Sequence, residues 1–241
     1  DRRKEFTDHA FEVLPSAGQA SGRSFTVTDR LSGLGPVSSF LTLSDFAPGQ
    51  DTSQLVVVDS NGNAVVITPS DFPMTPMIPG TGLNLGNRMD QFRLDKDHVN
   101  ALMPKKRPRI TPHALVIFKN NKFYMALSTP GGDMQAQALV QVLLNMQVFG
   151  MSLDQAVAAP RFYSTAWPSS FAPHESKPAH IRLEADLFAS AGQGLTDLGY
   201  TPEKDENWDK DFGAVGVIMR SDDGRLFSAA DPREETTALG R

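Results

Sequence analysis

Thr52, in the tetrapeptide Asp51-Thr52-Ser53-Gln54, is a candidate nucleophile. A threonine hydroxyl is a weak nucleophile and needs an adjacent base. If the peptide bond between Asp51 and Thr52 is cut, the new α-amine of Thr52, whose ordinary pKa is roughly 7.7–8.0, supplies that base. The tetrapeptide is thus consistent with a self-activated nucleophile or with an ordinary threonine that opens a strand, and by itself it favours the strand.

A second candidate is Pro130-Gly131-Gly132, which lies between an apolar run and a helical pattern. Two adjacent glycines allow backbone N–H groups to approach a ligand closely, and the start of a helix adds partial positive charge. Such donors stabilise the oxyanion that forms when a nucleophile attacks an amide, and one donor is worth about 2.7–4 kcal/mol. A plain strand-to-helix turn is an equally good interpretation of these three residues.

Two polar segments are candidates for substrate recognition. The first is a short loop whose candidate binding residues are Asn87, Arg88, Asp90 and Gln91. The second is the basic run 105–109, in which Arg109 could hold a carboxylate through two parallel hydrogen bonds. The alternatives are a capped turn for the first segment and a solvated basic loop for the second.

The composition excludes several other kinds of site. The 241 residues include no cysteine, so disulfides and thiolate metal sites are ruled out. The five histidines show no metal-ligand spacing, and we expect neither a metal nor a cofactor. A net charge of −5 gives no basic surplus for nucleic acid, and the sequence has no apolar run of about 18 residues that could span a membrane.

Apolar periodicity indicates the elements that position these residues. Three pairs of β-branched runs predict hairpins, at 54–59 with 64–68, 114–118 with 123–127, and 214–220 with 226–229. Helices are predicted at 133–149, 153–159 and 187–198, and a further strand at 180–184. Thr129 or Asp133 is expected to cap the first helix, whose apolar residues predict burial on more than one side. Ser152 is expected to cap the second helix. The alternation of strands and helices predicts an α+β layered sandwich.

Taken together and in this order, these segments resemble the small subunit of the γ-glutamyltranspeptidase family of N-terminal-nucleophile hydrolases. The resemblance starts at Thr52 and runs to near Arg241. The matching segments are 52, 57–59, 62–65, 82–92, 111–112, 129–132, 159–162 and 231–233. The resemblance implies an αββα sandwich of which this chain contributes part of the layers. Residues 1–51 would be the end of the large subunit or a flexible pro-segment, and residues 52–241 the small-subunit-like catalytic domain.

The resemblance also implies an activity, an autoprocessing threonine amidohydrolase or acyltransferase that acts on γ-glutamyl or related acyl amides. It implies cleavage between Asp51 and Thr52, an oxyanion site at Gly131 and Gly132, and Ser70 as the residue that orients the nucleophile. The implied partners are a large subunit, most of it absent from this chain, and a small amide substrate. Periplasmic or extracellular localisation is implied, with the cytoplasm left open. A non-catalytic homologue that serves as a binding or structural module is the alternative.

Departures from the family pattern concern the acyl group. Gln91 stands where glutathione-processing members carry an aspartate that binds the α-ammonium of the substrate, and an unpaired cation there is poorly compensated. Arg88 and Arg109 add positive charge. We therefore predict a substrate whose acyl part carries a carboxylate, or another polar group, and lacks a free α-amine. Asp71 could restore an ammonium contact, which keeps γ-glutamyl substrates open.

Overall fold

The computed structural model describes residues 52–70, 77–84 and 86–240. The predictions for residues 1–51, including Asp51, and for Asp71 lie outside the described residues.

A four-stranded antiparallel sheet forms the centre of the described structure, with the strand order β11-β10-β6-β5. Its strands are β5 (Ala114–Lys119), β6 (Lys122–Ser128), β10 (Gly216–Arg220) and β11 (Leu226–Ala229). Two of the predicted hairpins are therefore confirmed and share one sheet. Residues Asn120 and Asn121 close the first of them with positive φ angles, which asparagine tolerates better than most side chains.

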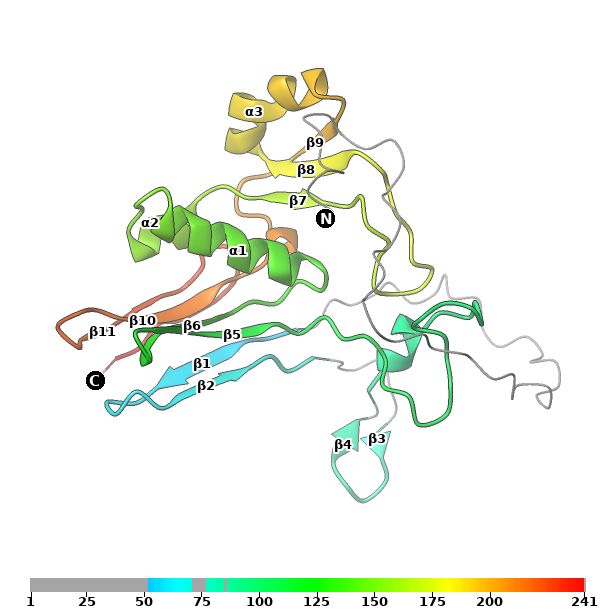
Figure 1. Ribbon diagram of the computed structural model, residues 1–241, viewed down its shortest axis with the longest axis horizontal. Coiled ribbons are helices and arrows are strands. Elements are labelled where there is room, and N and C mark those ends of the chain that lie inside the picture. Colours follow the sequence, from blue (N-terminus) through cyan, green and yellow to red (C-terminus); the bar gives the residue numbers. More distant parts are fainter. Residues whose placement is uncertain (1–51, 71–76, 85, 241) are drawn as a thin grey trace.

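Helices α1 (Met134–Gln147) and α2 (Leu153–Ala158) cover one face of this sheet (Figure 1). The core between helices and sheet is built from Met125, Leu127, Met134, Ala138, Leu139, Val142, Val157, Phe212, Val215 and Val217. The Ser152 side chain caps α2 in a reciprocal capping box with Gln155, as its position before an apolar run predicts.

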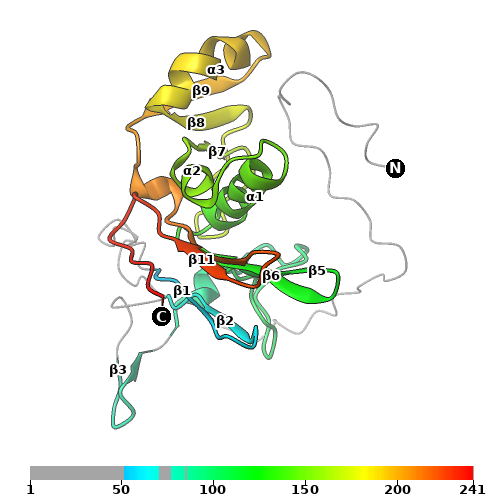
Figure 2. The same ribbon diagram turned by 90° about the vertical axis from the view of Figure 1, so that its left-hand side faces the viewer.

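The hairpin of β1 (Leu55–Val58) and β2 (Ala64–Ile67) packs on the opposite face of the sheet (Figures 1 and 2). Alternate residues of a strand point to opposite faces, and here Val56 and Val66 are half-buried toward the sheet. The outward residues Leu55, Val57, Val65 and Ile67 are exposed. The described chain therefore has a helix layer followed by two β layers, which fits the predicted α+β class and part of an αββα sandwich.

A second, three-stranded sheet joins β7 (Phe162–Ser164), β8 (His180–Glu184) and β9 (Thr201–Asp205). Strands β8 and β9 are parallel, and α3 (Ala185–Asp197) crosses between them (Figure 2). The sequence predicted β8 and α3 but neither β7 nor β9. The remaining elements are β3 (Met77–Ile78), β4 (Leu83–Asn84) and the short 3-10 helices η3 (Arg88–Gln91) and η4 (Lys210–Phe212).

Two expectations for α1 are wrong. Its apolar residues Val140 and Leu144 and its C-cap residue Val148 are exposed, because the helix packs on the sheet and α2 through one face. Neither Thr129 nor Asp133 caps it, since both side chains bond to other segments. No helix in the described part of the chain is both long and apolar enough to cross a membrane.

Candidate active site

Thr52 and Ser70 lie opposite each other, just before β1 and shortly after β2. They form an isolated antiparallel bridge, and their hydroxyl oxygens are 2.9 Å apart. The N–H of Ser53 also donates to the carbonyl of Pro69 at 3.0 Å, so the backbone fixes this pairing. The antiparallel β1–β2 register thus brings together two hydroxyl residues that are 18 positions apart in the sequence.

The same end of the hairpin is tied to the end of β6. The hydroxyls of Thr68 and Ser128 are 2.7 Å apart, and Ser128 is the last residue of β6. Ser128 pairs in register with Gly216, and the end of the Gln54 side chain packs against this glycine. The segment around Thr52 and the loop that follows Ser128 therefore lie at one end of the two β layers.

That loop contains Gly131 and Gly132 and leads into α1. Both glycines have positive φ angles, +118° and +54°, which non-glycine residues rarely adopt. Their carbonyls accept from the N–H groups of Met134 and Gln135 at 2.9 and 3.2 Å. Within the described part of the chain, no carbonyl accepts from the N–H groups of the two glycines. The backbone conformation therefore leaves two donors at the start of a helix, as an oxyanion site requires.

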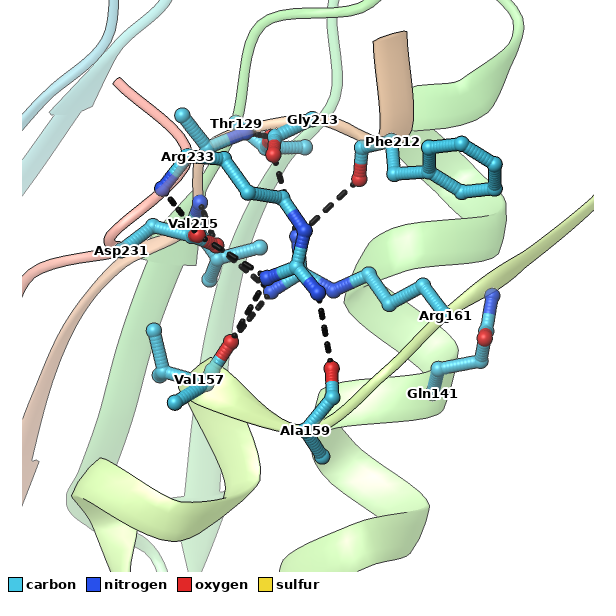
Figure 3. A network of polar contacts seen from close by, with 12 residues as sticks. Thr129, Gln141, Val157, Ala159, Arg161, Phe212, Gly213, Val215, Asp231 and Arg233 are labelled. Carbon is cyan, nitrogen blue, oxygen red and sulfur yellow. Dashed lines mark hydrogen bonds and ion pairs between the residues drawn. The ribbon is translucent and has the colours of Figure 1, made fainter. Parts of the chain in front are cut away.

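Behind the loop lies a buried ionic network (Figure 3). Asp231 accepts from Arg161 at 2.6 Å and from the guanidinium of Arg233 at 3.0 Å. Arg233 also pairs with both carboxylate oxygens of Glu184. All four side chains are at most 6% exposed. Burial lowers the pKa of the Arg161 guanidinium, and the Asp231 carboxylate acts against this shift.

This network holds the segment that supports the glycine loop. Arg161 donates to the carbonyls of Phe212 and Gly213 at 3.0 and 3.1 Å, and the N–H of Val215 donates to Asp231 at 2.8 Å. The N–H of Ala214 in turn donates to the hydroxyl of Thr129 at 2.8 Å. The segments 159–162 and 231–233, which the sequence showed only as marks of resemblance, meet here and position the loop.

Arg88, Gln91 and Arg109, which the sequence suggested as substrate-binding residues, lie together and bind one another. Gln91 is 1% exposed. A guanidinium can only donate, so the amide atom that faces Arg88 at 2.8 Å is the Gln91 oxygen, and the Gln91 nitrogen donates to the carbonyl of Arg109. Arg88 also reaches the hydroxyl of Thr111 at 3.3 Å and lies 5.9 Å from the centre of the Phe171 ring. The neutral Gln91 therefore links the guanidinium of Arg88 to the backbone of Arg109.

The guanidinium of Arg109 extends from this cluster toward the glycine loop. It lies 3.4 Å from Asp133, the residue after Gly132, and its side chain is 57% exposed. Asp133 also accepts from the hydroxyl and the backbone N–H of Ser170. Both Arg109 and Asp133 line a pocket of about 310 Å³ beside Tyr163. The sequence missed the roles of Asp133 and Ser170, because an aspartate before a helix is usually a cap.

Asn87 and Asp90, the other predicted recognition residues that the structure describes, differ in burial: Asn87 is partly buried and Asp90 is exposed. The side-chain oxygen of Asn87 is buried and has no hydrogen-bond partner among the described residues. The backbone carbonyl of Asp90 accepts from the N–H of Ala172 at 3.2 Å, and the Asp90 side chain is exposed. No group of three or more His, Asp or Glu residues within the described ranges could hold a metal ion.

Comparisons with known proteins identify relatives of this chain. The family described as Gamma-glutamyltranspeptidase matches residues 1–241. The chain is 31% identical over 196 residues to the glutathione hydrolase-like YwrD proenzyme of Bacillus subtilis, a match that covers 80% of this chain and 36% of the relative. It is 29% identical over 197 residues to the oxamate amidohydrolase proenzyme of Klebsiella pneumoniae, with the same coverage of 80% and 36%.

The structure also resembles that of gamma-glutamyltranspeptidase from Pseudomonas nitroreducens complexed with L-DON. The TM-score is 0.65 at 26% identity, and the match covers 79% of this chain and 100% of that one. The chain spans about a third of the length of the two curated relatives. Its mixed helices and sheets confirm the α+β class predicted from the sequence. The chain therefore belongs to the gamma-glutamyltranspeptidase family.

Proposed function

We propose that this chain carries the nucleophile of an autoprocessing threonine amidohydrolase or acyltransferase. The observation that carries the proposal is the 2.9 Å contact between the hydroxyls of Thr52 and Ser70. A hydroxyl nucleophile must be held in one orientation before it attacks. Ser70 is the positioning partner in this proposal, and the N–H groups of Gly131 and Gly132 are the oxyanion donors.

The chemistry has two stages. In the first, the Thr52 hydroxyl attacks the carbonyl of Asp51, and the Asp51–Thr52 C–N bond breaks with transfer of the hydroxyl proton to the nitrogen, which leaves an ester on the Thr52 oxygen and a free α-amine. Water then hydrolyses this ester, which releases the Asp51 carboxylate and regenerates the Thr52 hydroxyl. In the second, the Thr52 oxygen attacks the substrate amide while the α-amine accepts the hydroxyl proton. The C–N bond breaks, the amine leaves with that proton, and an acyl ester forms on Thr52. Water or a second amine then takes the acyl group.

The acyl group in this proposal carries a carboxylate and no α-amine. Arg109 is the half-exposed cation that would pair with the carboxylate, since its contact with Asp133 is long at 3.4 Å. Gln91 is neutral and already bonded to Arg88, so it offers no negative charge to an ammonium group. The name of one relative, oxamate amidohydrolase, points to an acid amide without an α-amine. Turnover of a glutaryl anilide is expected to exceed that of a γ-glutamyl anilide, and the reverse order would contradict this part.

A partner is proposed from the exposed face of the β1–β2 hairpin. Leu55, Val57, Val65 and Ile67 are each 47–53% exposed there, and such a contiguous apolar face indicates a contact surface. The curated relatives are proenzymes about three times as long as the matched segment. We therefore propose that a large subunit covers this face and completes the sandwich.

Replacement of Thr52 tests the proposal directly. Thr52→Ala in the full-length protein is expected to abolish both separation into two chains and amidase activity, because the attacking hydroxyl is gone. Ser53→Ala is the matched control, since Ser53 is adjacent and exposed and is held through its backbone. Mass spectrometry of the wild type is expected to show a fragment that begins at Thr52. An intact wild-type chain, or cleavage in Thr52→Ala, would favour the non-catalytic alternative.

A further inference from the structure

A large hollow beside the recognition cluster is lined by positive charge. Its volume is about 740 Å³, and its described lining includes four lysine or arginine side chains: Arg93, Lys106, Arg107 and Arg109. Among the described residues, no aspartate or glutamate lines it, although the chain as a whole has a net charge of −5. The hollow is therefore positively charged, although the chain as a whole carries a net negative charge.

Two of these cations have no side-chain partner among the residues that the structure describes. The guanidinium groups of Arg93 and Arg107 make neither a hydrogen bond nor an ion pair with any described residue, whereas Arg109 reaches Asp133. Arg93 is nevertheless half-buried and is fixed through its backbone, which bonds to Asn100 and Leu102. A partly desolvated arginine without a carboxylate is electrostatically costly, so the site is arranged for an anion that comes from outside.

Lys106 adds a third charge at a fixed position. Its ammonium donates to the carbonyls of Val99 and Ala101 at 2.7 and 3.0 Å. An ammonium has three donors, so one remains for a ligand. Trp167, which is 62% exposed, forms an apolar wall of the same hollow.

A neighbouring pocket shows that the charge excess is local. The 310 Å³ pocket shares Arg109 and Trp167 with the hollow but is also lined by Asp133, Glu175 and Lys177, so its charges are nearly balanced. The hollow includes Gln91 and Arg109 from the recognition cluster and none of Thr52, Ser70, Gly131 or Gly132. It is thus positioned to hold a part of a ligand remote from the bond that breaks.

We propose that this hollow binds an anionic extension of the substrate that carries two or more carboxylates. The inference rests on the proposed function for its link to an amide substrate, while the binding itself does not depend on Thr52. Arg93 and Arg107 each take one carboxylate, for which the planar guanidinium is geometrically suited. Lys106 contributes a point charge, and Trp167 packs against the apolar part of the ligand.

The test is calorimetric binding of propane-1,2,3-tricarboxylate to the full-length protein at low salt. This probe contains no amide, so a failure of the Thr52 proposal leaves its binding unchanged. We expect the double variant Arg93→Gln/Arg107→Gln to bind roughly 100-fold more weakly, because each lost charge-assisted hydrogen bond costs about tenfold or more. Arg107→Gln alone, at an exposed position, is expected to lose about tenfold and to fold normally.

Three controls complete the design. Lys122→Gln, which removes an exposed cation at the distant β5–β6 turn, is expected to bind the probe as the wild type does. The uncharged propane-1,2,3-tricarboxamide is expected not to bind, and 0.5 M salt is expected to weaken the tricarboxylate strongly. Equal losses in Lys122→Gln and Arg107→Gln would overturn the proposal. So would binding of tripolyphosphate without binding of the tricarboxylate, because the site would then be selective for phosphate.

Discussion

The buried network of Arg161, Glu184, Asp231 and Arg233 allows a quantitative test. It contains two positive and two negative groups, and Asp231 accepts from both arginines at 2.6 and 3.0 Å. At an effective dielectric constant of about 20, the attraction at 2.6 Å is about 6 kcal/mol, and the cost of burying both ions offsets part of it. Asp231→Asn keeps the shape of the side chain but leaves the network with one excess positive charge.

Removal of one partner of a buried ion pair typically costs about 3–5 kcal/mol. We expect a loss of that size for Asp231→Asn and for Arg161→Met, which leaves one excess negative charge. The double variant is charge-balanced, so its loss is expected to be smaller than the sum of the single losses by about 2 kcal/mol or more. It stays less stable than the wild type, because the carbonyls of Phe212 and Gly213 lose their donor.

The free energy of unfolding is measured in urea by tryptophan fluorescence for the full-length wild type, the two single variants and the double variant. Trp208 is a suitable probe, since its indole N–H donates to the carbonyl of Ala158 at 3.3 Å, close to the network. Asp222→Asn is the control, because its 97% exposed carboxylate pairs only loosely with Lys119 and should contribute less than about 0.5 kcal/mol. Additivity of Asp231→Asn and Arg161→Met within about 0.5 kcal/mol would refute the reasoning.

Two further predictions concern the β1–β2 hairpin. Gly216→Ala would place a Cβ 2.2 Å from the amide nitrogen at the end of the flexible Gln54 side chain, which can turn away, so the free energy of unfolding is expected to fall by only about 1 kcal/mol or less; Gly240→Ala, with open space around it, should be neutral in the same urea titration. The pKa of Asp59 is lowered by hydrogen bonds from the Asn63 side chain and backbone and from the Asn61 and Gly62 backbones. Asn63→Ala is therefore expected to raise the pKa of Asp59 in an NMR titration. A lowered pKa means that this carboxylate stabilises the fold above its ordinary titration range and loses that effect as the pH falls; an unchanged Asp59 pKa in Asn63→Ala would contradict the assignment.

Local patterns in the sequence were sufficient to predict most of the elements around the site. Strand alternation and turn residues predicted β1, β2, β5, β6, β10 and β11, since these signals depend on residues a few positions apart. They could not predict β9, whose residues Thr-Pro-Glu-Lys-Asp are largely polar. That strand exists because α3 returns the chain to pair in parallel with β8.

The candidate site, too, was predictable from the sequence only in part. The ordered segments around Thr52 and Gly131-Gly132 were recognisable as residues with chemical potential, because a nucleophile and a donor loop are local features. Only the tertiary structure placed Ser70 2.9 Å from Thr52 and joined Arg161 to Asp231 across 70 positions of the chain. It also showed that Gln91 is buried and is bonded to the guanidinium of Arg88 and to the backbone carbonyl of Arg109. Such contacts depend on strand register and on burial, and neither is fixed by neighbouring residues in the sequence.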